Sequence, residues 1–145
     1  MKKALTIRRA TLGLWLSTAG AASVLTVRLA SNPLAGPSAT VTPLMTVPLA
    51  GSQSKELSMV TVEYGPGGST PVHTHHAQAL LYVLEGSVVM QIRGAEPITL
   101  SPGQTWYEGP NDVHAVSRNA SSSASAKYVV LMVKDKGAPI LKVVE

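Results

Sequence analysis

Short apolar runs separated by turn-forming clusters fill the chain from Lys55 onward. No stretch of a dozen residues there keeps the 3.6-residue periodicity of an amphipathic helix, which favours an all-β fold over an α/β sheet. Strands joined by turns rich in Gly, Pro, Asn and Ser at this spacing are typical of a sandwich or barrel. The expected strands are 57–64, 79–84, 88–93, 98–100, 105–108, 114–118 and 128–133.

The length of 145 residues fits a single domain, which we place at residues 52–145. The preceding stretch, 31–51, is rich in Pro, Ser, Thr and Ala and is interpreted as a linker or leading segment, with a loose leading strand as the alternative to a linker. The chain contains no cysteine, so disulfides, thiolate metal sites and cysteine nucleophiles are excluded.

Residues 1–30 have the layout of a secretory signal. A short cationic stretch, 1–10, precedes an uncharged and mostly apolar run, 11–27. The Arg8-Arg9 pair resembles a twin-arginine signal, and the general secretory route is the alternative. We expect an exported protein, periplasmic or secreted, unless the segment stays uncleaved as an N-terminal membrane anchor.

The positive net charge of the chain is confined to this leading segment. Five of the twelve Lys and Arg residues precede Ser31, whereas all eight acidic residues lie at Glu56 or later. The remaining seven basic residues do not outnumber those eight acids, so the basic surface that nucleic acid requires is missing. We therefore expect no nucleic-acid partner.

Histidines carry the clearest chemical signal. Residues two apart in a strand point to the same face, with Cα atoms roughly 6.5 Å apart, so His73 and His75 can converge on one metal ion. His114 from a neighbouring strand would complete a three-histidine site with open positions. His76 directly follows the pair and should face away from it.

Two stretches, 67–86 (GGSTPVHTHHAQALLYVLEG) and 103–119 (GQTWYEGPNDVHAVSRN), resemble the two motifs of the cupin superfamily. The resemblance implies a single-domain jelly-roll barrel, also called a double-stranded β-helix, with a divalent metal ion at its centre. It also implies that His73, His75 and His114 are ligands. The position of the family's glutamate ligand is held by Ala79, and Gln78 is the alternative oxygen donor. Homodimers are plausible by the same resemblance.

A site of neutral imidazoles favours Zn, Fe, Ni, Cu or Mn over hard ions such as Mg. Glu108 and Asp112 could act as general acid or base, or could be a solvated strand end and a turn residue. The predicted pocket wall, whose members could equally be plain core, consists of Tyr82, Met90, Trp106, Tyr107, Val116 and Met132.

These features predict an exported metal-binding protein with a small-molecule ligand, an enzyme such as a dioxygenase or isomerase. Two alternatives remain open: a non-catalytic module that binds or senses a small ligand, and a degenerate barrel with a structural role only. No substrate follows from the sequence.

Overall fold

The computed structural model describes residues 38–144, so the predicted export signal lies outside the described residues. Within them the chain forms eleven strands and no helix. No helix of this part of the chain could therefore cross a membrane. The all-β prediction is confirmed. The strands are β1 (Thr40–Pro48), β2 (Lys55–Tyr64), β3 (Ser69–Thr70), β4 (His73–Thr74), β5 (Gln78–Glu85), β6 (Val88–Ile92), β7 (Ile98–Leu100), β8 (Thr105–Glu108), β9 (His114–Asn119), β10 (Ala126–Asp135) and β11 (Lys142–Val143).

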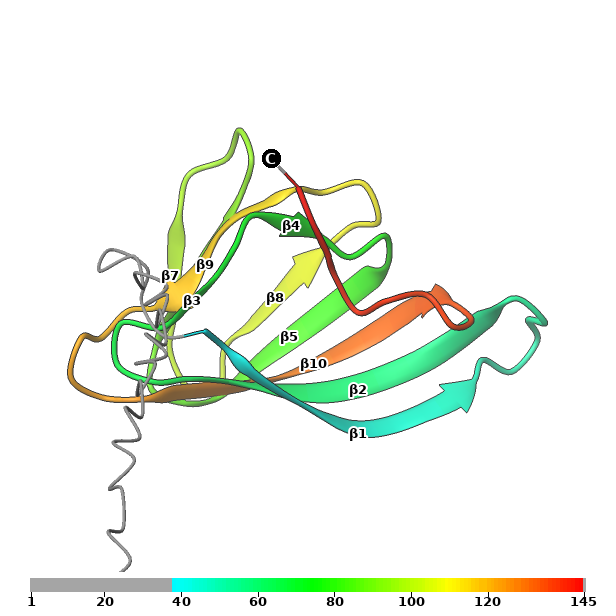
Figure 1. The fold of residues 1–145 in the computed structure, drawn as a ribbon, viewed down its shortest axis with the longest axis horizontal. Helices are drawn as coiled ribbons and strands as arrows, with labels where there is room; N and C mark the ends of the chain where they lie inside the picture. Colours follow the sequence, from blue (N-terminus) through cyan, green and yellow to red (C-terminus); the bar gives the residue numbers. More distant parts are fainter. Residues whose placement is uncertain (1–37, 145) are drawn as a thin grey trace, which may run out of the picture. The chain divides into compact units, whose positions relative to one another are not determined.

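Two antiparallel sheets face each other in a jelly roll (Figure 1). The first has the strand order β1-β2-β10-β5-β8, and the second the order β11-β4-β9-β6-β7, with β3 paired to β9. The pairs β1–β2 and β6–β7 are consecutive in sequence, but other neighbours are far apart, as in the pairing of β10 with both β2 and β5. The predicted jelly-roll architecture is thus confirmed.

Period-two alternation builds the core between the sheets. In β5 the side chains of Ala79, Leu81 and Val83 are buried, whereas the residues between them are exposed. β10 alternates with the same period, but between buried and half-buried residues as far as Lys134. In β6 three consecutive residues, 88–90, are buried, so this strand is covered on both faces, as the broken alternation there predicts.

Strand β1 lies inside the stretch that the sequence suggests is a linker or leading segment. It pairs antiparallel with β2 along its whole length, with a register shift between Pro43 and Met45. Every residue of β1 is exposed. Proline is tolerated at such an edge, since it lacks only a hydrogen-bond donor that faces solvent. β1 therefore adds an edge strand to the first sheet, before residue 52.

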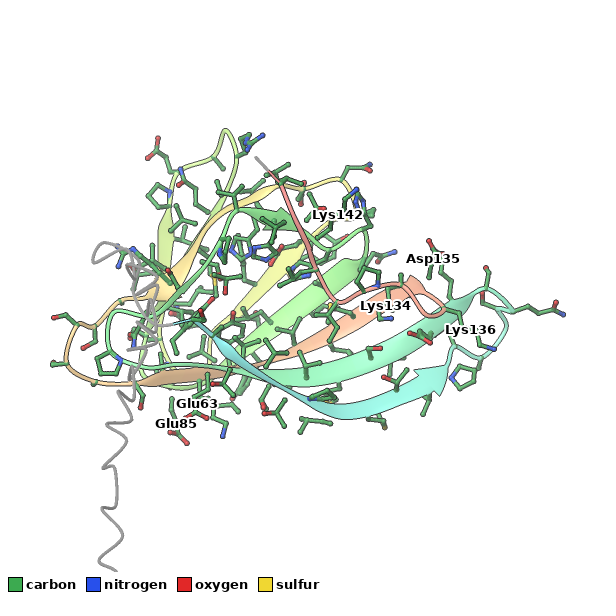
Figure 2. The ribbon with its side chains drawn as sticks, viewed as in Figure 1. Glu63, Glu85, Lys134, Asp135, Lys136 and Lys142 are labelled. Atoms are coloured by element: carbon green, nitrogen blue, oxygen red, sulfur yellow. The ribbon has the colours of Figure 1, made fainter. Side chains whose placement is uncertain are left out.

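The C-terminal segment joins the two sheets. After β10 the chain crosses to the other sheet, where β11 pairs with β4 (Figure 1). The crossing starts beside Lys134, Asp135 and Lys136, labelled in Figure 2. Lys134 is buried and donates hydrogen bonds to Glu56 and, over 2.6 Å, to the carbonyl of Ala138. This buried lysine fixes where the crossing leaves the sheet.

Candidate metal centre

The three predicted histidine ligands lie together between the sheets. His73 on β4 is directly paired with His114 on β9, and both are buried, at 2% and 3% exposure. His75 follows β4 and points to the same place. One ring nitrogen from each histidine lies within 4.8 Å of those of the others. The structure therefore brings together all three residues that the sequence singled out.

Backbone carbonyls fix the tautomers of two of these rings. Nδ1 of His73 lies 2.7 Å from the carbonyl oxygen of Pro71, and Nδ1 of His75 lies 2.7 Å from that of Ile140. A carbonyl oxygen can only accept a hydrogen bond, so each ring donates from Nδ1. In the neutral rings both Nε2 atoms consequently carry a lone pair.

The two Nε2 atoms of His73 and His75 lie 3.2 Å apart, which places two lone pairs face to face. A proton on one ring would relieve this repulsion, but burial lowers the pKa of His73 to about 4, opposed in part by the carbonyl of Pro71. The lowered pKa keeps His73 neutral near pH 7. A divalent metal ion bound by both nitrogens would relieve the repulsion.

His114 has no hydrogen-bond partner at either ring nitrogen, among the residues that the structure describes, although both atoms are buried. Its Nδ1 lies 3.2 Å from a carboxylate oxygen of Glu108, but without the direction of a hydrogen bond. Buried polar atoms without partners are rare in folded proteins. The orphaned nitrogens of His114 and the facing lone pairs of the other two rings fit a divalent metal ion.

Glu108 is a buried member of this cluster, not the solvated strand end that the sequence suggested. Its side chain is 7% exposed, and its two oxygens lie 3.6 Å from Nε2 of His75 and 3.2 Å from Nδ1 of His114. Burial opposes its ionisation, but His114 and His75 hold its pKa below the usual value. Side chains two apart in a strand share a face, so Glu108 lies on the same face of β8 as the half-buried Trp106. This alternation is the sequence signal that could have predicted the burial of Glu108.

Other residues considered from the sequence lie outside the cluster. Gln78 is exposed and lies on the face of β5 opposite to Ala79, so its side chain does not point toward the histidines. His76 is exposed, as expected, with a φ of 47°. Asp112 accepts a hydrogen bond from the backbone of Gly109 over 2.7 Å and is a turn residue.

A hollow that is lined mostly by apolar side chains and is partly open to solvent adjoins the histidines. Besides the cluster and Glu108, its polar lining consists of Thr70 and Tyr128. Its apolar lining consists of Val41, Val60, Val62, Leu81, Val130, Met132, Ile140 and Leu141.

Of the six residues predicted as pocket wall, Met132 lines this hollow. Tyr82 and Tyr107 do not, because strand alternation turns both outward, and they are 45% and 52% exposed. Met90 is fully buried in the core and Val116 is half-buried, and neither lines the hollow. The ring of Trp106 packs edge-on against His114, with centroids 4.9 Å apart.

The fold and the histidine cluster define a jelly-roll protein with a candidate metal site. Residues 60–133, more than half of the chain, match the family model described as the cupin domain. The chain belongs to the cupin family.

Solved structures with the same fold include several enzymes. The DMSP lyase DddQ from Ruegeria pomeroyi DSS-3 is 21% identical, with a TM-score of 0.59 over 72% of this chain and 51% of that one. An oxalate oxidase in complex with the substrate analogue glycolate is 24% identical, with a TM-score of 0.58 over 73% and 55%. A cupin-like protein from Thermotoga maritima is 21% identical, with a TM-score of 0.58 over 73% and 75%.

The chain spans only about half the length of the DMSP lyase and the oxalate oxidase. At these identities the likeness establishes the fold alone. No curated protein sequence matches the chain.

Proposed function

We propose that this protein is an exported, metal-dependent cupin enzyme that acts on a small organic molecule. The observation that carries the proposal is the 3.2 Å contact between Nε2 of His73 and Nε2 of His75, the ring nitrogens that are left after both Nδ1 atoms donate to backbone carbonyls. With His114, these residues would hold one divalent ion. Three protein ligands leave positions open for water or a substrate.

A bound divalent ion would supply Lewis acidity, which polarises a carbonyl or enolate oxygen, or a redox centre for O₂ if the ion is iron, copper or manganese. The contributions of the chain itself are to hold the ion and to orient its ligands. Backbone carbonyls keep His73 and His75 in the tautomer that offers Nε2. Such outer partners fix ring orientation in metal sites generally.

The lining of the hollow points to the class of substrate. Eight of its side chains are apolar, and none of the lining residues is a Lys or Arg. A substrate with several carboxylates would lack cationic partners there, apart from the metal ion. We therefore favour a small molecule with an apolar body and one oxygen donor that reaches the ion. The DMSP lyase and the oxalate oxidase support an enzymatic role, because they are enzymes built on this fold.

A non-catalytic binding role is the second candidate. Among the described residues that line the hollow, Tyr128 is the only titratable one besides the histidines and Glu108. Burial and the neighbouring Tyr64 raise the pKa of Tyr128 well above its ordinary value, so it cannot serve as a base near neutral pH. Aerobic turnover of catechol, flavonol or thiol substrates by the iron-loaded protein would favour the enzyme. Binding without turnover would favour this alternative.

Elemental analysis tests the metal site. The protein would be purified without chelator or metal-affinity resin, beside His73→Ala and the control His76→Asn, in which asparagine tolerates the left-handed backbone of that exposed position. We expect about one divalent ion per chain in the wild type and in His76→Asn, and little in His73→Ala. Equal metal content in all three would contradict the proposal.

Export is the part of the proposal that rests on residues 1–30 alone. Fractionation of cells that express the full chain, with the Arg8-Arg9 pair either intact or changed to two lysines, tests both the compartment and the route. Export that persists in the lysine variant would indicate the general secretory route. Protein retained in the cytoplasm in both forms would contradict export.

A further inference from the structure

We infer that Glu108 is a fourth metal ligand, which supplies from β8 the carboxylate that the cupin pattern places at position 79 of β5. This inference rests on the proposed metal site and deepens it. Three relationships carry it: the register of β5 and β8, the position of the two carboxylate oxygens, and the charge of the cluster.

The register places the two positions side by side. Ala79 on β5 is the direct antiparallel partner of Glu108 on β8. Side chains of such partners project from the same face of a sheet, with Cβ atoms roughly 4.5–5.5 Å apart. Both residues are buried, at 2% and 5% exposure, so both point inward. A carboxylate on either strand can thus reach the same region, and the small side chain of Ala79 leaves space for that of Glu108.

The carboxylate of Glu108 lies among the rings that would hold the ion. One oxygen is 3.6 Å from Nε2 of His75, the atom left with a lone pair, and the other is 3.2 Å from Nδ1 of His114. Two histidines are therefore within reach of this single carboxylate. An ion held by the three rings would lie within the same small volume.

Charge gives the third argument. A buried carboxylate is costly unless a positive charge or hydrogen bonds compensate it. The ion-pair partners of Glu108 are the imidazoles of His75 and His114, and the contact with His114 lacks hydrogen-bond direction. Neither partner is a Lys or Arg, whose positive charge would be permanent. A divalent ion bound by the carboxylate would balance its charge, and the resulting site would have the three-histidine, one-carboxylate composition of the family pattern.

A positioning role is the competing interpretation, in which Glu108 only orients His114 as an outer partner. Moving the carboxylate from position 108 to position 79 distinguishes a metal ligand from a positioning residue. In the double variant Ala79→Glu/Glu108→Ala the carboxylate returns to β5, where it can still reach the ion but no longer approaches His114 from β8. Glu108→Gln, nearly identical in shape, removes the charge and keeps the packing. Glu56→Gln removes a partly buried carboxylate elsewhere in the barrel and is the control.

Metal affinity would be measured by competition with a chelator, and the visible spectrum of the Co²⁺-loaded protein would report the ligand set. We expect Glu108→Gln to weaken affinity by at least the 10- to 100-fold typical of an outer-partner loss. It should also change the Co²⁺ spectrum. The exchanged double variant should recover affinity to within about tenfold of the wild type, by the same scale. Glu56→Gln should change neither readout.

Two results would overturn the inference. One is wild-type affinity and an unchanged Co²⁺ spectrum in Glu108→Gln. The other is weakened affinity with an unchanged spectrum, which identifies a positioning residue. Thermal unfolding of each variant checks that it folds, and if the double variant does not, the spectrum of Glu108→Gln decides. Failure of the metal site itself looks different, because wild type and His73→Ala would then bind equally little metal.

Discussion

His73 and His114 face each other as direct partners across the β4–β9 pair, although some forty positions separate them in the chain. The register of the sheet therefore determines the geometry of the candidate metal centre. A slip of one residue would turn one of the two rings to the opposite face. Because the ion would bridge the two segments only in the folded barrel, metal binding and folding should be coupled.

The first prediction follows from this coupling. Addition of a divalent ion at about 100 times its dissociation constant should stabilise the barrel by about 2.7 kcal/mol, since the unfolded chain lacks the site. For a domain of about 100 residues this corresponds to a rise in Tm of roughly 10–20 °C. Calorimetry with Zn²⁺ or Mn²⁺ would measure it. His114→Ala should abolish the rise, and an equal rise in that variant would contradict the prediction.

The second prediction concerns the C-terminal segment, because the carbonyl of Ile140 accepts the hydrogen bond from Nδ1 of His75. Truncation after Ala138 removes this carbonyl and β11, but keeps the acceptor of Lys134. Loss of an outer partner typically weakens metal binding by about 10- to 100-fold, and we expect a loss of this size here. Titration calorimetry on both forms would measure it.

Ile140→Ala is the matched control for the truncation. It keeps the backbone carbonyl and removes only the side chain, which lines the hollow. This variant should therefore bind metal nearly as well as the wild type. If Ile140→Ala weakened binding as much as the truncation, burial by the side chain, not the carbonyl, would be the cause.

Most of the fold could be predicted from the sequence, since period-two alternation is strong in long, half-buried strands. β7 and β8 begin and end at the predicted residues. β1 lies in the stretch interpreted as a linker or a loose leading strand, and its bounds could not be predicted, because its prolines and exposed side chains give no alternating pattern. The two-residue strands β3, β4 and β11 are too short to carry one.

The site was predictable only in part, and the reason is the register between strands. The spacing of His73 and His75 shows by itself that they share a face. The link to His114, and the neighbourhood of Ala79 and Glu108, depend on which residues pair across the sheets. A single sequence does not contain that pairing. Glu108 therefore looked like a surface residue, although it is buried beside the histidines.

The third prediction concerns a buried hydroxyl cluster centred on Tyr64. Its hydroxyl lies 2.7 Å from that of Thr70 and 2.6 Å from that of Ser117, and it accepts a hydrogen bond from Tyr128 over 3.2 Å. Tyr64→Phe leaves these three groups without that partner. We expect a loss of about 1–3 kcal/mol in the free energy of unfolding. Urea denaturation would measure it, with the exposed Tyr107→Phe as a control that should change little.

The fourth prediction compares two glycines with positive φ. Gly86, between β5 and β6, has a φ of 67°, and an added Cβ would lie 2.4 Å from the carbonyl oxygen of Ser125 and 2.8 Å from Cα of Ala126. Gly94 has a φ of 87°, but an added Cβ there would meet nothing within 4 Å. Gly94→Ala should cost only the left-handed backbone, about 1–2 kcal/mol.

Gly86→Ala adds a backbone clash to the same strain and should cost about 2–5 kcal/mol in total. Chemical denaturation of both variants would give the difference directly. Equal losses for the two variants would show that the β10 end of the sheet moves away from the new methyl group without cost.

The fifth prediction uses the buried ion pair between Glu56 on β2 and Lys134 on β10, whose side chains are 12% and 5% exposed. The hydrogen bond from Lys134 lowers the pKa of Glu56 below its usual 4.5, with burial opposing and the backbone of Gly137 assisting. A carboxyl group whose pKa is lower in the folded state than in the unfolded state stabilises the fold at pH values above the unfolded pKa. That contribution is lost as the pH falls through the folded value.

Wild type should therefore be more stable than Glu56→Gln at pH 7, and the difference in Tm should shrink steadily as the pH falls below about 4.5. Thermal unfolding of both proteins between pH 7 and pH 3 would measure this difference. The other carboxylates titrate in both proteins, so their effects on Tm cancel in the difference. Glu63→Gln, which removes an exposed carboxylate on the same strand, is the control. A difference that stayed constant down to pH 3 would mean that Lys134 contributes through packing alone, with no stabilisation by the charge of Glu56.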